Sequence, residues 1–138
     1  MPSPGFELRP IGHVESVLRA RGQGPLQGDE GAPDSTLVFD PSVAQGLKDL
    51  AVGQEALLFT WLDRTKRDVL AVHPRGNPAT PLTGVFSTRS PDRPNPIGLH
   101  RIQIAAIDGL RFAVRNLEAL DGTPILDLKP ILGPIDER

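Results

Sequence analysis

Glycine and proline occur frequently along the whole chain, and this frequency disfavours long helices and long strands. The 138 residues include 14 glycines and 15 prolines, spread along the whole length. Proline lacks the backbone donor that a helix interior or a central strand needs, and glycine weakens both through its conformational freedom. The sequence therefore predicts short extended segments joined by turns.

Short apolar segments bounded by these breakers are typical of strands. We expect strands within residues 8–18, 35–39, 55–61, 69–72 and 84–89, and two more between Leu99 and Asn116. Closing such strands into a barrel removes the exposed edges that they would otherwise leave. The expected fold is all-β: a small closed β-barrel of six to eight short strands with one short helix, in a single domain over residues 1–138. A β-sandwich is the alternative.

One segment has helical character. Asp40 supplies an N-cap acceptor, and Pro41 suits the first helical position. Val43, Leu47 and Leu50 then form one apolar stripe, and Gly53 is a suitable stop signal.

Two alternating runs flank Ile107-Asp108-Gly109 and predict a hairpin. A two-residue loop, Asp108-Gly109, would mix the two faces of the sheet. A three-residue loop with Gly109 in the left-handed region keeps them separate. It pairs Ala106 with Leu110, Ile104 with Phe112 and Ile102 with Val114. The same register places Arg101 opposite Arg115 on the outer face, where either an anion lies between the guanidinium groups or both turn into water.

Composition excludes several classes of protein. There is no cysteine, so disulfides and thiolate chemistry are absent. No glycine-rich phosphate loop opens a helix, and His13, His73 and His100 lack the spacing of metal ligands. No apolar run has the length of a membrane span, and the first residues do not read as a signal peptide. We expect a cytoplasmic protein that binds neither metal, membrane nor DNA.

The middle of the chain is basic, with nine basic and four acidic groups in residues 61–115. Within it, Pro91, Pro94 and Pro96 stiffen residues 86–98, here called the proline-braced segment. A stiff loop that presents Arg89, Arg93 and Asn95 can hold a carboxylate or phosphate at low entropic cost. The alternative is a rigid connection with solvated arginines.

Two motifs carry a resemblance to a known family. Residues 84–99 (GVFSTRSPDRPNPIGL) closely resemble the signature of the TrmO/TsaA-like (YaeB-like) family, and residues 120–130 (LDGTPILDLKP) resemble its second signature. Residues 11–16 and 25–28 are also similar to the start of that family. Departures are Leu62-Asp63, where the family often has a histidine-containing pair, and Ile131, where an aromatic residue is common.

The resemblance implies a compact β-barrel, usually dimeric, that binds S-adenosylmethionine. It also implies methylation of N6 of threonylcarbamoyladenosine at position 37 of tRNA, which makes tRNA and a second copy the expected partners. The alternatives are an enzyme that uses the same cofactor on a small-molecule acceptor, and a non-catalytic barrel that binds an anion or the cofactor. Arg64, Lys66, Arg67 and Arg75 are candidate phosphate contacts.

The family's contacts and the chemistry of the cofactor together suggest a set of binding residues. Arg89 suits the cofactor carboxylate, leucines suit the adenine, and Asp121, Phe86 or Trp61 suits the sulfonium. Asp121 is the first candidate for a general base and Asp63 the second, although an Asp-Gly turn also caps backbone donors. The expected cofactor-binding residues are Pro25, Leu26, Gln27, Phe86, Arg89, Arg93, Asn95, Leu99, Asn116, Leu117, Glu118, Leu120, Asp121 and Thr123.

Overall fold

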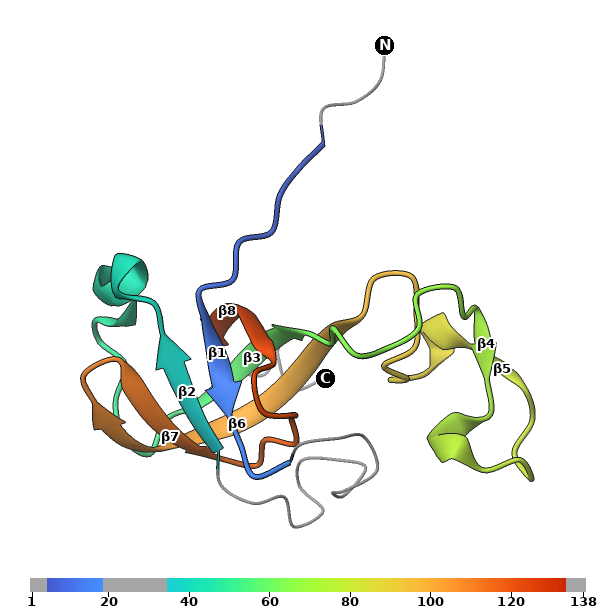
Figure 1. Ribbon diagram of the computed structural model, residues 1–138. Coiled ribbons are helices and arrows are strands. Elements are labelled where there is room, and N and C mark those ends of the chain that lie inside the picture. Colours follow the sequence, from blue (N-terminus) through green and yellow to red (C-terminus); the bar gives the residue numbers. More distant parts are fainter. Residues whose placement is uncertain (1–4, 19–34, 134–138) are drawn as a thin grey trace.

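The computed structural model describes residues 5–18 and 35–133 (Figure 1). Six strands of this part of the chain close into a barrel, in the order β1-β2-β7-β6-β3-β8. The expected all-β barrel is therefore confirmed. The barrel strands are β1 (Gly12–Glu15), β2 (Ser35–Phe39), β3 (Glu55–Trp61), β6 (Ile97–Asp108), β7 (Arg111–Arg115) and β8 (Pro124–Pro130).

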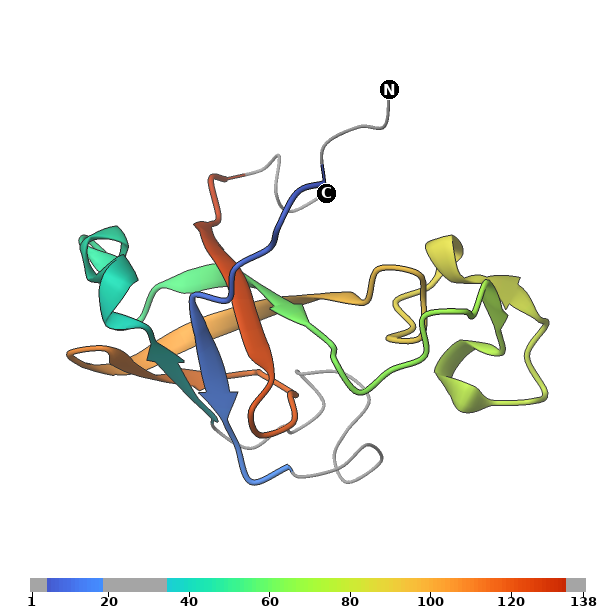
Figure 2. The same ribbon diagram turned by 45° about the horizontal axis from the view of Figure 1, so that its top comes forward.

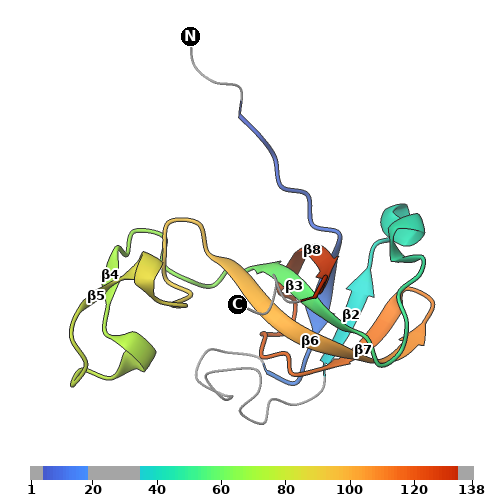
Figure 3. The ribbon, with the colours of Figure 1, turned by 180° about the vertical axis from the view of Figure 1, so that it is seen from behind.

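A long excursion between β3 and β6, residues 62–96, forms the arm. It contains β4 (Ala71–Val72) and β5 (Thr83–Gly84), which pair as a separate two-stranded sheet, and the 3-10 helices η2 (Pro74–Gly76) and η3 (Val85–Ser87). The arm projects from one side of the barrel in all three views (Figures 1, 2 and 3). None of the helices in the described residues has the length and apolarity needed to cross a membrane.

The barrel interior is filled by alternate residues of its strands, as the pleat of a β-strand requires. Phe39 and Phe112 meet edge to face, with ring centroids 5.2 Å apart. The face predicted for the hairpin is confirmed at Ile102, Ile104, Phe112 and Val114, which are all buried, whereas Ala106, predicted on the same face, is exposed. Among the described residues, the main cluster of buried apolar side chains is Val14, Leu37, Phe39, Ala56, Leu58, Ile102, Ile104, Phe112, Val114, Leu117, Ala119 and Ile125.

The expected helix is a 3-10 helix, η1 (Pro41–Leu47), and it ends before Gly53. Its start is as predicted, since the Asp40 carboxylate accepts from the Ser42 N–H at 2.9 Å. The apolar stripe Val43, Leu47 and Leu50 packs on the core. After η1 the chain turns sharply, and the Gly53 N–H donates to Ile104 O at 2.8 Å. Gly53 therefore joins the chain to β6 and does not terminate a helix.

The hairpin register differs from the prediction. Asp108 faces Arg111 across a two-residue loop, and a bulge lies between Ile104 and Ala106. The extra residue restores the alternation that a two-residue loop would otherwise disturb, so Ile104 faces Val114, in place of the predicted Phe112, and both side chains remain inside. Gly109 has φ of 59°, as predicted.

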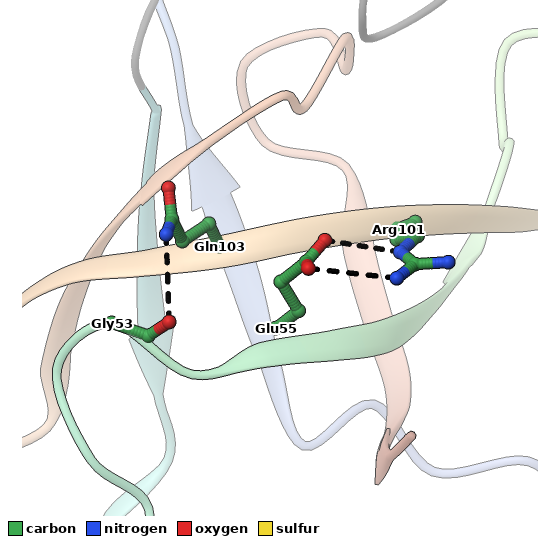
Figure 4. A network of polar contacts seen from close by, with 4 residues as sticks. All are labelled: Gly53, Glu55, Arg101 and Gln103. Carbon is green, nitrogen blue, oxygen red and sulfur yellow. Dashed lines mark hydrogen bonds and ion pairs between the residues drawn. The ribbon is translucent and has the colours of Figure 1, made fainter. Parts of the chain in front are cut away.

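Arg101 and Arg115 lie on neighbouring strands, but they are not opposite one another. Arg115 faces Gln103, and Arg101 donates from Nε to the Glu55 carboxylate of β3 at 3.0 Å (Figure 4). Gln103 donates to Gly53 O on the same face. The outer face of β6 therefore carries an ordinary cross-strand ion pair where the sequence suggested paired arginines.

The prediction of a strand over residues 84–89 is wrong. Of these residues only Gly84 belongs to a strand, at the end of β5, and η3 follows directly. Thr88 explains the change, because its N–H and its hydroxyl both donate to Val85 O. Such local side-chain bonds compete with strand pairing. The first and fourth expected strands also shorten, to Gly12–Glu15 and Ala71–Val72.

Candidate functional site

The two signature segments meet at one end of the barrel. Thr60, near the end of β3, pairs with Gly98 on one side and with Ile125 on the other. The proline-braced segment runs directly into Gly98, and the turn at residues 121–123 runs directly into β8. Segments separated by more than twenty residues of sequence therefore flank the same strand end.

Residues 62–67, here called the bridge segment, follow that strand end and contact both signatures. The Leu62 N–H donates to Pro96 O at 2.8 Å. Arg67 donates from Nε to Pro94 O at 2.7 Å. At its other side, Arg64 donates from Nη2 to Asp121 O. The bridge segment thus links the proline-braced segment to the Asp-Gly turn.

Arg93 stabilises the proline-braced segment from within. Its guanidinium donates to three backbone carbonyls of the arm, those of Val85, Thr88 and Ser90. These bonds fix the path of the chain around Arg89, whose side chain is exposed, and around Phe86, which is 79 % exposed. Arg93 was expected to bind the cofactor. In this structure its guanidinium binds backbone carbonyls instead and stabilises the loop that carries Arg89.

Asp121 organises the second signature. Its Oδ1 accepts from the Ser16 N–H at 3.0 Å, and its own N–H donates to Leu18 O at 2.6 Å. The turn needs Gly122, which has φ of 86°. Asp121 therefore ties the turn to residues 16–18 and performs the backbone capping that an Asp-Gly turn predicts.

An open depression of about 520 Å³ lies beside Asp121 on the outer face of β1 and β2. Of the residues expected to bind cofactor, it contains only Asp121. Its other lining residues were not predicted as site residues, although several belong to the segment that resembles the start of the family. The lining is His13, Glu15, Ser16, Val17, Thr36, Asp121 and Gly122.

The remaining expected residues differ in burial. Leu99, Asn116 and Asp63 are exposed, and Glu118 and Leu120 are half-buried. Leu117 and Thr123 are buried, and the Thr123 hydroxyl donates to Leu120 O. Leu117 belongs to the core, so only its main chain can face a ligand. Pro25, Leu26 and Gln27 lie outside the described residues. Within the described ranges, no group of three or more His, Asp or Glu side chains could hold a metal ion.

A polar pair lies inside the barrel at the same end. The Thr60 hydroxyl and His100 Nε2 are 2.8 Å apart. Gly98 makes room for them, since a Cβ at this position would lie 2.3 Å from Thr60 Oγ1 and 2.8 Å from His100 Nε2. Burial lowers the pKa of His100 to about 4, because the ring loses the water that would solvate its charged form.

This shift predicts an acid-dependent loss of stability. Between pH 6.5 and about pH 4 the unfolded chain binds a proton that folded His100 does not, so the free energy of unfolding falls as pH decreases. The loss is at most about 3 kcal/mol, the free energy that corresponds to this difference in pKa. Urea unfolding at several pH values measures it. His100→Gln should flatten the slope, whereas His13→Gln and His73→Gln should retain it; an unchanged slope in His100→Gln would refute the assignment.

Comparisons with known proteins agree with this architecture. The model of the tRNA-methyltransferase O N-terminal domain matches residues 13–137. An S-adenosyl-L-methionine-binding protein of Archaeoglobus fulgidus is 39 % identical over 129 residues, which are 94 % of this chain and 91 % of that protein. A probable S-adenosyl-L-methionine-binding protein of Methanothermobacter thermautotrophicus is 37 % identical over 131 residues, which are 95 % of this chain and 93 % of that protein.

Solved structures give the same result. A crystal structure of TrmO superposes with a TM-score of 0.75 at 26 % identity, covering 96 % of this chain and 57 % of that one. A crystal structure of TrmO from Pseudomonas aeruginosa superposes with a TM-score of 0.72 at 25 % sequence identity, covering 94 % of this chain and 57 % of that one. A second Archaeoglobus fulgidus relative is 38 % identical, but the chain spans only 35 % of its length. The match extends over nearly the whole chain, and the chain belongs to the family defined by the tRNA-methyltransferase O N-terminal domain.

Proposed function

We propose that this protein is an S-adenosylmethionine-dependent methyltransferase that modifies N6 of threonylcarbamoyladenosine at position 37 of tRNA. The observation that carries the proposal is the bridge segment, which joins both family signatures at one barrel end through Arg67 and Arg64. The names of the related proteins support the cofactor, and the family model supports tRNA as the substrate. We propose a cytoplasmic location because tRNA is the proposed substrate.

The proposed site residues suit the chemistry of the cofactor. When bound, S-adenosylmethionine supplies an electrophilic methyl group on a sulfonium. Arg89 provides a cation for its carboxylate, Leu99 and Leu120 provide apolar surface for its adenine, and Asp121 provides a carboxylate for its positive charge. Phe86, Asn95, Asn116, Glu118 and Thr123, with residues 25–27, complete the proposed set.

The proposed role of the protein in the reaction is mainly positioning. Methyl transfer needs the acceptor nitrogen in line with the departing sulfur, and a preorganised site lowers the barrier by holding that geometry. The urea-like N6 is a weak nucleophile, so a carboxylate that removes its proton would help. We assign this role to Asp121, with Asp63 at the start of the bridge segment as the second candidate.

Replacing Arg89 with alanine is expected to weaken S-adenosylmethionine binding by about 1 to 3 kcal/mol, the loss of one charge-assisted hydrogen bond. Isothermal titration calorimetry measures the change. Arg101→Ala is the matched control, because it removes an exposed arginine that pairs with Glu55 on the barrel wall. Equal affinities for Arg89→Ala and wild type would exclude Arg89 from the site.

We further propose that the protein forms a homodimer through the arm. Leu70, Leu82 and Phe86 of the arm are 66 %, 65 % and 79 % exposed, and burying exposed apolar side chains against a second copy would stabilise a dimer. Leu82→Glu should convert the dimer to a monomer in light scattering. Val52→Glu, at a 62 % exposed residue outside the arm, should leave the dimer intact. A wild-type monomer at all concentrations would refute the dimer.

The substrate is tested by methyl transfer. Purified protein is incubated with S-adenosylmethionine labelled in the methyl group and with tRNA that carries threonylcarbamoyladenosine. The expected result is label in the modified adenosine after nuclease digestion. Cofactor binding without transfer to RNA would reject the tRNA assignment, and label in metabolites would favour a small-molecule acceptor. Failure to bind the cofactor would favour the alternative of a non-catalytic barrel that binds an anion.

A further inference from the structure

Arg93 holds the first half of the proline-braced segment from within, but residues 94–96 lack such internal support. Pro94 and Pro96 have no N–H, so this stretch offers carbonyl acceptors but few donors. Asn95 O accepts from the Ile97 N–H, whereas Pro94 O and Pro96 O accept from the bridge segment, through Arg67 and Leu62. The bridge segment therefore supplies the donors that the prolines remove.

Arg67 makes contacts in three directions. Its Nε donates to Pro94 O at 2.7 Å, and its Nη2 donates to Asn95 Oδ1 at 3.1 Å. Its Cζ lies 5.1 Å from the centre of the Trp61 ring, within the range of a cation–π contact. One guanidinium thus joins the end of β3 to two consecutive residues of the proline-braced segment.

These contacts depend on the shape of the side chain as well as its charge. A guanidinium is a planar group with donors at fixed angles, and it stacks on aromatic rings. An ammonium is a point donor that cannot reproduce the two directed bonds and the stacking together. A lysine at this position would keep the charge and lose the geometry.

We infer that Arg67 is a positioning residue, which fixes the proline-braced segment against Trp61 and so places Arg89 for the cofactor, and that it does not act as a phosphate contact. The part concerning Arg89 rests on the proposed function. The part concerning Trp61 does not, because it is a property of the protein alone.

Trp61 is the one tryptophan of the chain, so its fluorescence reports on this contact. In Arg67→Lys and Arg67→Gln, the emission maximum should move to longer wavelength and quenching by acrylamide should increase, since the ring loses its cover. Lys66→Gln is the matched control, because the neighbouring lysine contacts Asp92 through its main-chain N–H. Its emission should equal that of wild type. Wild-type emission and quenching in Arg67→Lys would overturn the inference.

Kinetics of methyl transfer distinguish positioning from RNA binding. We expect Arg67→Lys and Arg67→Gln to raise KM for S-adenosylmethionine about tenfold, the equivalent of one directed bond, with a smaller change in kcat. A phosphate contact would behave differently: Arg67→Lys would resemble wild type, and Arg67→Gln would raise KM for tRNA with a weaker salt dependence. That pattern would also overturn the inference. If wild type bound no cofactor, the fluorescence comparison would still decide the role of Arg67.

Discussion

Replacing Gly98 with alanine is expected to destabilise the protein by about 3 kcal/mol. The new Cβ would lie 2.3 Å from Thr60 Oγ1 and 2.8 Å from His100 Nε2, well inside contact distance. Thr60 is fully buried, so it can move away only by breaking its hydrogen bond to His100. Overpacking and an unsatisfied buried group each cost about 1 to 3 kcal/mol.

Urea unfolding tests this with a control from the same signature. A Cβ at Gly84 would meet nothing within 4 Å, so Gly84→Ala should change the free energy of unfolding by less than about 1 kcal/mol. Adding Thr60→Ala to Gly98→Ala should recover part of the lost stability, because it removes the closest clash. Equal stability of Gly98→Ala and Gly84→Ala would show that the strand end does not need this glycine.

Replacing Asp121 with asparagine is expected to lower kcat by roughly a hundredfold to ten-thousandfold if its carboxylate acts as the general base. The substitution keeps an Oδ1 acceptor for the Ser16 N–H, so the turn should remain folded. Single-turnover methyl transfer at saturating cofactor isolates this step. The same measurement on Asp63→Asn should show a change of less than about tenfold.

Other outcomes would reassign the base. A large loss in Asp63→Asn alone would move the role to the bridge segment. An unchanged kcat in Asp121→Asn, with unfolding like that of wild type, would leave Asp121 with a structural role in the turn. In either case Asp121 would not remove the proton, and the proposed mechanism would keep only the positioning of the two substrates by the site.

The features that were predicted most accurately from the sequence are those that a local residue pattern determines. The strands at residues 35–39 and 55–61 have the predicted bounds, because an uninterrupted apolar alternation fixes both their extent and their inward face. Asp40 and Pro41 likewise begin η1 as expected. The inward face of the hairpin was also predictable. The bulge after Ile104 was not, because several registers put the same residues inside.

The site depends on contacts between distant residues, which a local pattern does not reveal. Arg64 and Arg67 read as exposed cations suited to phosphate, yet their guanidinium groups donate to carbonyls 57 and 27 residues away. One signal was present in the sequence. A segment with prolines at 91, 94 and 96 lacks donors, so a neighbouring segment has to provide them, and the charged turn after β3 is the segment that does.

The central claim is that both signature segments form one S-adenosylmethionine site at this barrel end. A thermal-shift titration with S-adenosylmethionine tests it most directly. At about a hundredfold excess over Kd, binding adds about 2.7 kcal/mol to the stability of the folded state, equivalent to a rise in Tm of about 10 °C. We predict a rise that grows with the logarithm of cofactor concentration and that shifts to higher concentrations in Arg89→Ala. A Tm that stays constant up to millimolar cofactor would contradict the account.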